Sequence, residues 1–169
     1  MQHLHAHRRM PYIEAPQASN GSREDLFEQL ARSDDDRASL ILRRTEHSFL
    51  VMNKFPYNAG HLLAVPNRKV AQLVELNAAE RVDFFDSIVE GQAILERALS
   101  PDGFNVGFNL GKAAGAGIPQ HLHCHIVPRW EGDTNFMPVV SNTRVLPEAM
   151  EAMWERLRTF VDEFSANGS

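Results

Sequence analysis

The sequence predicts an α+β fold, a mainly antiparallel sheet of about five strands with one long central helix and a C-terminal helix. Three observations lead to this prediction. Several short apolar runs are separated by turn residues, two longer stretches carry apolar residues at helical spacing, and some of the predicted strands follow each other through tight turns. Short turns of this kind favour an antiparallel sheet over an alternating parallel one.

Residues 1–37 are expected to form an N-terminal arm, because they mix His, Pro, Ser, Asn and Asp without a sustained apolar period. One short helix is predicted near Asp25 to Ala31. Residues 38–169 are assigned to a single domain. In the arm, His3, His5 and His7 alternate within a polar tail, where a disordered terminus or an adventitious metal binder is the better interpretation.

The first strands of the predicted sheet lie close together in the sequence. Ser39 to Arg43 and Ser48 to Asn53 are apolar, partly β-branched and separated by a short polar stretch, which predicts an antiparallel pair. The turn PYNAG follows, and its proline, asparagine and glycine suit a sharp reversal. His61 to Val65 is then predicted as a third strand, which Pro66 ends.

A long helix is predicted next, over Asn77 to Leu99. Its apolar residues recur at three- and four-residue spacing and are expected to form one stripe, made of Val82, Phe85 and Val89 with Phe84, Ile88 and Leu95 alongside. Two further strands are predicted at Phe104 to Leu110 and His121 to Pro128, with the glycine-rich loop Gly111 to Pro119 between them. Pro147 to Phe164 carries enough apolar residues on one face to predict the closing helix.

Composition limits the classes of protein to which the chain can belong. With 169 residues, of which 43% are hydrophobic and 23% charged, one domain can bury a core without metal or disulfide staples. A net charge of -5 gives no reason to expect nucleic-acid binding. The single cysteine, Cys124, excludes an internal disulfide, and no apolar run approaches the roughly 18 to 20 residues of a membrane span. With no signal peptide recognised, we expect a cytoplasmic protein without a membrane partner.

The segment QHLHCHIVPRW carries the most chemical information. Because side chains alternate across a strand, His121, His123 and His125 are expected on one face, and Leu122, Cys124 and Ile126 on the other. The segment also follows a glycine loop whose backbone N–H groups are suited to cradle phosphate. Three interpretations remain open from the residues alone: a catalytic metal site, packed structural histidines, or a nucleophilic site.

The motif His121-Leu-His123-Cys-His125-Ile-Val resembles the signature of the histidine triad (HIT) family, His-x-His-x-His followed by two apolar residues. Two other segments agree with the family: NKFPYNAGHLLAVP, residues 53–66, and FNLG before the glycine loop. The likeness covers about residues 38–130. More narrowly, AGAGIPQHLHCHIVPRWEGDTNFMPV and RRMPYI resemble a bacterial branch that includes diadenosine tetraphosphate phosphorylases. The resemblance implies a HIT-like fold.

The resemblance also implies a role for each histidine of the triad. His123 would attack the α-phosphorus of a nucleotide and form a covalent nucleotidyl-histidine, which water or phosphate then releases. Neutral imidazole is a competent nucleophile near neutral pH. His121 would orient the nucleophile through its backbone carbonyl group, and His125 would contact a phosphate oxygen.

Three further positions match binding residues of the family. The resemblance implies that Asn53 bonds the ribose hydroxyls, that His61 supports the histidine cluster, and that Asn109 lies at the scissile phosphate. From the residues alone, simpler interpretations stay open. Asn53 could end its strand, Asn109 could cap a turn, and His61 could be a surface histidine.

The sequence departs from the family at its structural zinc site. Many members hold zinc through a Cys-x-x-Cys pair, a histidine after the third strand and the first triad histidine. Here those cysteines are absent, and Lys69 takes the approximate place of the other histidine. His121 alone cannot hold zinc tetrahedrally. We therefore expect no built-in metal or cofactor, and only Mg2+ brought with the substrate's phosphates.

The resemblance implies an enzyme that cleaves dinucleoside polyphosphates such as diadenosine tetraphosphate, by phosphorolysis or hydrolysis. One alternative within the same fold is a nucleoside phosphoramidase, and a second, from a different functional class, is a nucleotide-binding sensor without turnover. A metal-dependent hydrolase that uses the triad as ligands is a third. The expected partners are the nucleotide substrate and a second copy of the chain, since the family usually forms homodimers.

Overall fold

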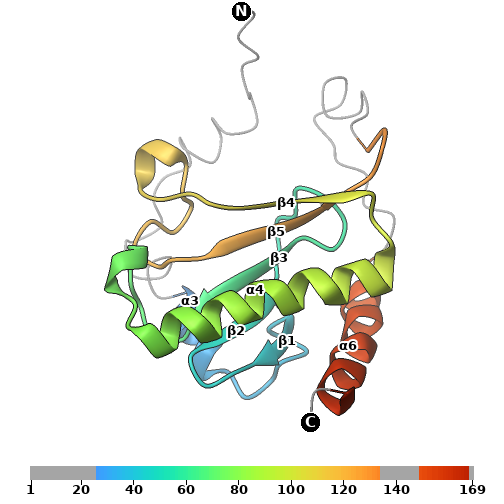
Figure 1. Ribbon diagram of the computed structural model, residues 1–169, viewed down its shortest axis with the longest axis horizontal. Coiled ribbons are helices and arrows are strands. Elements are labelled where there is room, and N and C mark those ends of the chain that lie inside the picture. Colours follow the sequence, from blue (N-terminus) through green and yellow to red (C-terminus); the bar gives the residue numbers. More distant parts are fainter. Residues whose placement is uncertain (1–25, 134–148, 168–169) are drawn as a thin grey trace, which may run out of the picture.

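The computed structural model describes residues 26–133 and 149–167, and within the last helix it describes side chains up to Val161. Five strands form one sheet in the order β1-β2-β3-β5-β4, and every neighbouring pair is antiparallel. Figure 1 shows α4 lying across this sheet, with α6 near one end of α4. The α+β prediction is confirmed. The main elements are α3 (Leu26–Arg32), β1 (Ile41–Arg44), β2 (Ser48–Met52), β3 (Leu62–Pro66), α4 (Ala78–Leu99), β4 (Gly103–Phe108), β5 (Cys124–Arg129) and α6 (Met150–Asn167).

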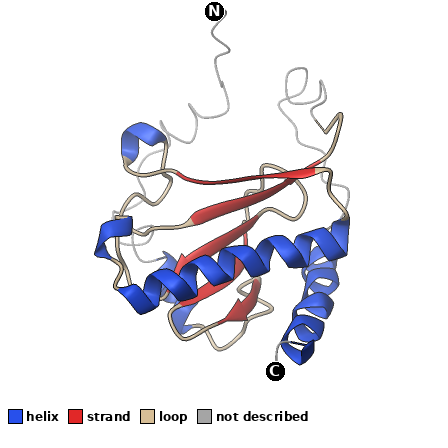
Figure 2. Ribbon diagram, in the orientation of Figure 1, coloured by secondary structure: helices blue, strands red, loops and turns tan. Residues whose placement is uncertain are grey.

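Two apolar clusters cover the two faces of the sheet. Figure 2 shows the strands of the sheet in red and the helices in blue. Strands β2 and β3 are buried along their whole length, because alternate side chains enter opposite clusters. The larger cluster lies under α4 and α6 and includes Leu50, Leu62 and Ile126. The smaller one lies under α3 and includes Phe27, Val51 and Leu63. The sheet therefore has a second covered face, to which helix α3 contributes.

Helix α4 begins at a capping box. The Asn77 side chain accepts a hydrogen bond from the Glu80 amide at 3.0 Å, and the Glu80 carboxylate accepts one from the Asn77 amide at 2.8 Å. Further along, Gly91 lets the helix approach the sheet closely. A Cβ atom there would lie 2.8 Å from Ile126 Cδ1.

The predicted single apolar stripe on this helix is wrong. Phe84, Ile88 and Leu95 are buried, but Val82, Phe85 and Val89 are 63%, 64% and 52% exposed. The helix meets the sheet on the face that includes Gly91, and the second set of apolar residues points away from that contact. The structure thus leaves an exposed apolar surface on α4.

Helix α6 covers the β1 edge of the sheet. The indole Nε1–H of Trp154 donates to the Ile41 carbonyl at 2.9 Å, and the Arg158 guanidinium donates to the Leu42 carbonyl. These bonds give hydrogen-bond partners to carbonyl groups of the edge strand β1, which would otherwise be unpaired. At the other edge of the described sheet, β4 pairs with β5 on one side only.

The last predicted strand starts later than expected. His121 and His123 precede β5, which begins at Cys124. The Leu122 amide donates to the Val70 carbonyl at 2.6 Å, so the segment before β5 is held by a contact outside the strand ladder. The predicted glycine loop contains a short 3-10 turn, Lys112–Ala114. The described part of the chain has no helix long and apolar enough to cross a membrane. His3, His5 and His7 lie outside the described residues.

Candidate active site

The three triad histidines lie on the α3 face of the sheet, while the residues between them enter the opposite cluster. Leu122, Cys124 and Ile126 all belong to the core under α4. The ring centroids of His123 and His125 are 5.1 Å apart. Opposite His125 on the neighbouring strand is Gly107, where a Cβ atom would meet nothing within 4 Å. Open space therefore lies beside His125.

A fourth histidine joins the triad through the turn between β2 and β3. Gly60 has a φ angle of +74°, a conformation that favours glycine, and it sets the chain direction just before His61. His61 is 1% exposed, and its Nε2 lies 3.0 Å from Nδ1 of His125. The sharp turn that the sequence predicts therefore brings His61 onto the triad.

Hydrogen bonds define the protonation of this histidine pair. The backbone N–H of Tyr57 donates to Nδ1 of His61 at 3.0 Å, so this nitrogen carries no proton. In the neutral ring the proton is then on Nε2, which donates to Nδ1 of His125. The neutral His125 ring then carries its proton on Nε2. The nearest Asn109 atom is Nδ2, at 3.4 Å; because this nitrogen is also a donor, Asn109 does not take up the Nε2–H of His125. His125 thus presents an N–H donor, which is the group needed to bind a phosphate oxygen.

His123 has the opposite arrangement. Its Nδ1 lies 2.8 Å from the backbone carbonyl oxygen of His121. Because a carbonyl oxygen only accepts, Nδ1 must hold the proton and Nε2 holds the free lone pair. The central histidine is therefore held as a neutral ring with its nucleophilic nitrogen on the far side from the carbonyl.

His121 is the most deeply buried member of the triad, at 1% exposed. Its Nε2–H donates to the Pro66 carbonyl at 2.8 Å. Among the residues that the structure describes, its Nδ1 is the one buried side-chain nitrogen or oxygen with no hydrogen-bond partner. His121 therefore acts on His123 through its main chain, while its own ring is held by one bond and by packing.

Burial keeps the triad uncharged. Loss of hydration lowers the pKa of His123, and the bond to the His121 carbonyl only partly opposes this effect. Burial, together with the nearby His123, lowers the pKa of His125 to about 4. Burial is also the main cause of the lowered pKa of His121. At neutral pH the three rings are neutral.

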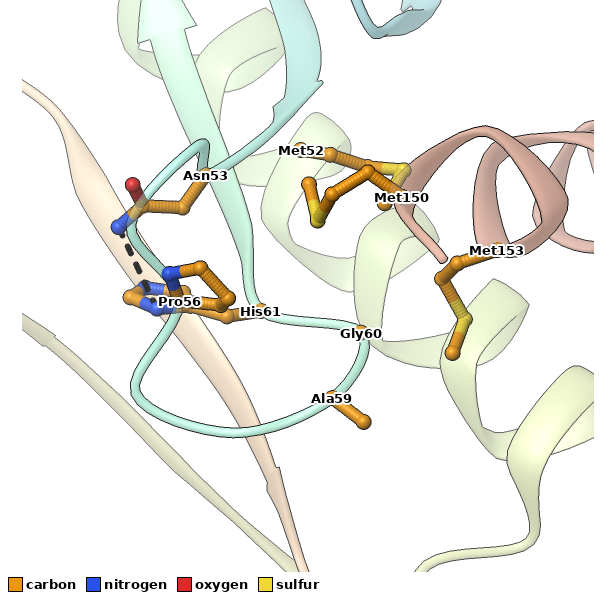
Figure 3. A pocket seen from close by; sticks show the side chains of 8 residues that line it. All are labelled: Met52, Asn53, Pro56, Ala59, Gly60, His61, Met150 and Met153. Carbon is orange, nitrogen blue, oxygen red and sulfur yellow. Dashed lines mark hydrogen bonds between the residues drawn. The ribbon is translucent and has the colours of Figure 1, made fainter. Parts of the chain in front are cut away.

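The remaining predicted site residues lie at the edge of this cluster. Asn53 follows β2 with its amide 3.3 Å from Nδ1 of His61, as Figure 3 shows, and its Oδ1 accepts from the Phe55 amide at 3.0 Å. Asn109 follows β4 and contacts His125. All six predicted residues are thus linked by contacts between neighbours. Their individual roles in binding and catalysis remain predictions.

Sequence reasoning missed two aromatic residues that touch the cluster. The Phe27 ring on α3 lies 5.3 Å from the His121 ring and 5.2 Å from the His123 ring, centroid to centroid. The Tyr57 ring lies 4.8 Å from His61 and 5.7 Å from His125. Tyr57 belongs to the PYNAG turn that the sequence singled out. Phe27 is a single aromatic residue in a short helix, and no local pattern signals its contact with residues so distant in the sequence.

Arg129, the last residue of β5, belongs to a polar network beside the site. Its guanidinium forms two bonds to the Asp133 carboxylate, at 2.6 and 2.7 Å. The same carboxylate accepts from the Asn58 amide at 2.9 Å. This network ties the β2–β3 turn to the end of β5. Arg129 therefore helps to position the turn that carries Tyr57 and precedes His61.

A pocket borders the site near Asn53 and His61. Methionines from β2 and α6, namely Met52, Met150 and Met153, form its other side (Figure 3). The nucleophile His123 does not line it. The histidine cluster, rather than the pocket, therefore contains the candidate nucleophile.

The residues around His121 do not fit a structural zinc ion. Zinc would need four ligands in tetrahedral geometry. Lys69, a cation, instead forms an ion pair with Glu28 at 3.2 Å, and the charges of both residues act on His121. In the described ranges, no group of three or more His, Cys, Asp or Glu side chains is arranged to hold a metal ion. The protein surroundings of His121 are thus an ion pair and the Phe27 ring.

Comparison with known sequences gives a consistent result. A family model described as the HIT domain matches residues 35–132. The chain is 35% identical over 155 residues to an AP-4-A phosphorylase of Mycobacterium tuberculosis, covering 89% of this chain and 79% of that protein. It is 36% identical over 95 residues to an asymmetrical bis(5'-nucleosyl)-tetraphosphatase of Schizosaccharomyces pombe, covering 56% of this chain and 52% of the relative.

Solved structures agree on the fold. A zinc-bound histidine triad family protein of Mycobacterium smegmatis superposes with a TM-score of 0.67 at 20% identity, over 83% of this chain and 95% of that one. The NitFhit protein of Caenorhabditis elegans superposes with a TM-score of 0.58 at 32% identity, over 74% of this chain and 27% of that one. The five-stranded sheet and its helices therefore match a known architecture.

Proposed function

The chain belongs to the HIT domain family, and on that premise we propose that it cleaves dinucleoside polyphosphates, such as diadenosine tetraphosphate, through a covalent nucleotidyl intermediate on His123. The name of the Mycobacterium tuberculosis relative supports the substrate class. The observation that carries the mechanism is the bond from His123 Nδ1 to the His121 carbonyl oxygen, 2.8 Å long. This bond leaves the Nε2 lone pair for attack at phosphorus.

The proposed reaction has two displacements at the same phosphorus atom. In the first, Nε2 of His123 forms a bond to the α-phosphorus as the bond to the bridging oxygen breaks. The nucleoside polyphosphate leaves as an anion with the electron pair of the broken bond, and the His123 ring, which keeps its Nδ1 proton, carries the positive charge of the intermediate. In the second, an oxygen of inorganic phosphate or of water attacks the same phosphorus, and the N–P bond breaks to restore the neutral imidazole.

The neighbouring residues supply charge stabilisation and position the substrate. The Nε2–H of His125 donates to a phosphate oxygen, and the His61 ring fixes this donor in the required tautomer. Asn109 lies beside that donor and shares the phosphate. Asn53 bonds the ribose hydroxyls. The transfer depends mainly on positioning and on stabilisation of phosphate charge, as phosphoryl-type transfer requires.

We also propose that the active enzyme holds no built-in metal. This proposal is supported by the ion pair of Lys69 and Glu28 beside His121, where relatives of the zinc-binding kind would need ligands. Mg2+ enters only with the phosphates of the substrate. Stoichiometric zinc in active protein purified without an affinity tag, with activity that depends on it, would contradict this assignment.

The proposed assembly is a homodimer formed through the β4 edge. Val106 and Phe108 on this strand are 45% and 37% exposed, and Val82, Phe85 and Val89 add exposed apolar surface on α4. An apolar edge strand is a template for pairing with another chain. A second copy could extend the sheet across this edge while burying the apolar side chains. A cytoplasmic location and the absence of nucleic-acid and membrane partners stay predictions of the sequence.

Product analysis with diadenosine tetraphosphate tests the proposed activity and identifies the acceptor. With inorganic phosphate present, a phosphorylase yields ADP and ATP, whereas a hydrolase yields AMP and ATP with or without phosphate. The proposal predicts one of these pairs. Nucleotide binding without any product would favour a sensor. Cleavage confined to AMP-linked amines would favour a phosphoramidase.

A further inference from the structure

We infer that the ring of Phe27, on helix α3, is a positioning element for the imidazoles of His121 and His123. The helix spans Leu26–Arg32 and so precedes the segment that matches the HIT domain, residues 35–132. Helix α3 therefore contributes to the site from outside the residues that the family model matches. The inference deepens the proposed function, and its kinetic part rests on it.

The Phe27 ring packs against the His121 and His123 rings and against the apolar cluster on the α3 face of the sheet. Its side chain is 3% exposed and belongs to the cluster with Val51 and Leu63. It meets the His121 ring almost perpendicularly, at 74°, and the His123 ring at 49°. Such edge and tilted contacts between ring systems are favourable beyond the burial of area. Phe27 thus borders both rings without offering a hydrogen bond.

Contacts at both ends hold α3 in place, so the Phe27 ring has a fixed position. At the C-terminal end, the Arg44 guanidinium donates to the carbonyl groups of Leu30, Ala31 and Ser33 at 2.9, 2.7 and 2.8 Å. It also pairs with Asp36 at 2.7 Å. Near the other end, Glu28 pairs with Lys69, which lies beyond β3. A short helix would have little stability alone, and these contacts supply it.

Two of the three triad histidines need such support because the strand ladder does not reach them. His121 and His123 both precede the first residue of β5. The ring of His121 has one hydrogen bond, and its buried Nδ1 has no partner among the described residues. The ring of His123 has its single bond to the His121 carbonyl. Rotation of the His123 ring would break that bond and turn Nε2 away, and the Phe27 ring limits this rotation.

The same contacts explain how His121 is held without the zinc that its surroundings do not fit. The ion pair of Lys69 and Glu28 joins α3 to the segment after β3, on the side of His121. On the same helix, Phe27 immediately precedes Glu28 and contacts both histidine rings. Packing of a helix therefore fixes the histidine that a metal ion would otherwise fix.

The test compares Phe27→Ala with Leu30→Ala, a matched control. Leu30 is on the same helix and packs on the same cluster, but it has no ring contact with the triad. Removing the Phe27 ring should lower kcat on the order of tenfold or more, since small misplacements of reacting groups are costly. KM should stay within about twofold because the Asn53 and His125 contacts remain. Leu30→Ala should keep kcat near that of the unmodified protein.

Side-chain nitrogen NMR of the histidines gives a second readout that needs no substrate. In the unmodified protein, His123 should show a proton on Nδ1 alone. In Phe27→Ala, signals of both tautomers should mix, and Leu30→Ala should leave them unchanged. Because this readout does not depend on turnover, it separates failure of the inference from failure of the proposed function.

A further variant, Phe27→Leu, keeps apolar volume and serves if Phe27→Ala does not fold. It should show a smaller fall in kcat and a partial mixing of tautomers. The inference is overturned if either folded variant of Phe27 keeps the kcat and the histidine signals of the unmodified protein. It is equally overturned if Leu30→Ala reproduces both changes, because α3 would then act only as general structural support.

Discussion

At the scale of single residues, the chemistry depends on which nitrogen of each histidine carries the proton. The His121 carbonyl fixes the proton of His123 on Nδ1, and the His61 ring fixes that of His125 on Nε2. One ring therefore presents a lone pair and its neighbour presents a donor. The same residue type thus offers a lone pair in one ring and an N–H donor in the other, because a main-chain acceptor holds His123 and a side-chain donor holds His125.

The pH dependence of kcat follows from the neutral state of His123. A proton on Nε2 removes the lone pair, and burial lowers the pKa of His123 from its usual value of 6.5. The activity should therefore persist below pH 6.5 and fall only at more acidic pH. A kcat profile measured with protein that remains folded checks this, and an acidic limb at or above pH 6.5 would contradict it.

Stability should follow the same histidines. Because burial lowers the pKa of His125 from 6.5 to about 4, the unfolded chain takes up a proton before the folded protein does. This contribution to stability is complete above pH 6.5 and is lost as the pH falls from 6.5 toward 4. Denaturant unfolding across this window, with His125→Asn as a comparison, should show a smaller decrease for the variant. An equal decrease would assign the pH dependence to other groups.

Asn53 is the residue predicted to bind the ribose. Replacing it with Ala should weaken nucleotide binding by about 1 kcal/mol for each hydrogen bond lost. The fold should survive, because Asn53 is partly exposed and follows the end of β2. Calorimetric titration with a nucleoside monophosphate measures the loss. An unchanged affinity would place the ribose elsewhere.

At the scale of elements, the turn between β2 and β3 has the strictest backbone requirement. Gly60 has a φ angle of +74°, and a Cβ atom would lie 2.5 Å from Leu99 Cδ1. Gly60→Ala should therefore destabilise the protein by about 1 kcal/mol or more. It should also lower kcat, since His61 is the next residue.

Two glycine controls separate the causes of this effect. Gly103→Ala adds a Cβ where nothing lies within 4 Å, at a φ angle that side chains tolerate, and should change the melting temperature little. Gly111 has a φ angle of +79° with open space around it, so Gly111→Ala measures strain without a clash. If all three variants melt alike, the tight contact of Gly60 has no energetic importance.

Elements defined by local periodicity were predicted well, and those defined by distant contacts were not. The long helix was predicted to span Asn77 to Leu99 because its cap and its end lie in its own sequence. The exposed set Val82, Phe85 and Val89 was misplaced because spacing alone does not say which apolar face meets the sheet. The contact of Phe27 with the triad joins a helix that precedes the first strand to a segment that precedes the last strand. These segments are far apart in the sequence, so no local pattern predicts the contact.

The site shows the same division. The alternation of His121, His123 and His125 and the turn before His61 are local patterns, and the sequence identified both. The chain of hydrogen bonds from the Tyr57 amide through His61 to His125 depends on the register of β3 against β5, which pairs Leu63 with His125. Register of that kind is set by tertiary packing, so the protonation of the site became clear only from the structure.

At the scale of the whole molecule, the two edges of the sheet differ. Helix α6 covers β1 through Trp154, whereas β4 has exposed apolar side chains beside the exposed face of α4. The proposed dimer uses this surface. Light scattering should give twice the chain mass for the unmodified protein, and the double variant Phe85→Lys and Val106→Lys should give a monomer.

A control for this experiment is Val74→Lys, which changes an apolar residue that is 87% exposed but lies on neither β4 nor α4. This variant should remain dimeric. A monomeric mass for the unmodified protein at micromolar concentration would show that the exposed apolar surface has another use.

The covalent step is tested most directly by rapid quenching. The protein is mixed with diadenosine tetraphosphate labelled in the α-phosphate, denatured in base during turnover, and digested for mass spectrometry. The covalent mechanism predicts a nucleoside monophosphate on the peptide that contains His123, stable in base and lost in acid. His123→Ala should bind nucleotide without turnover or label. Turnover by the unmodified protein with no labelled His123 at any quench time, together with inversion of configuration at phosphorus, would contradict the account.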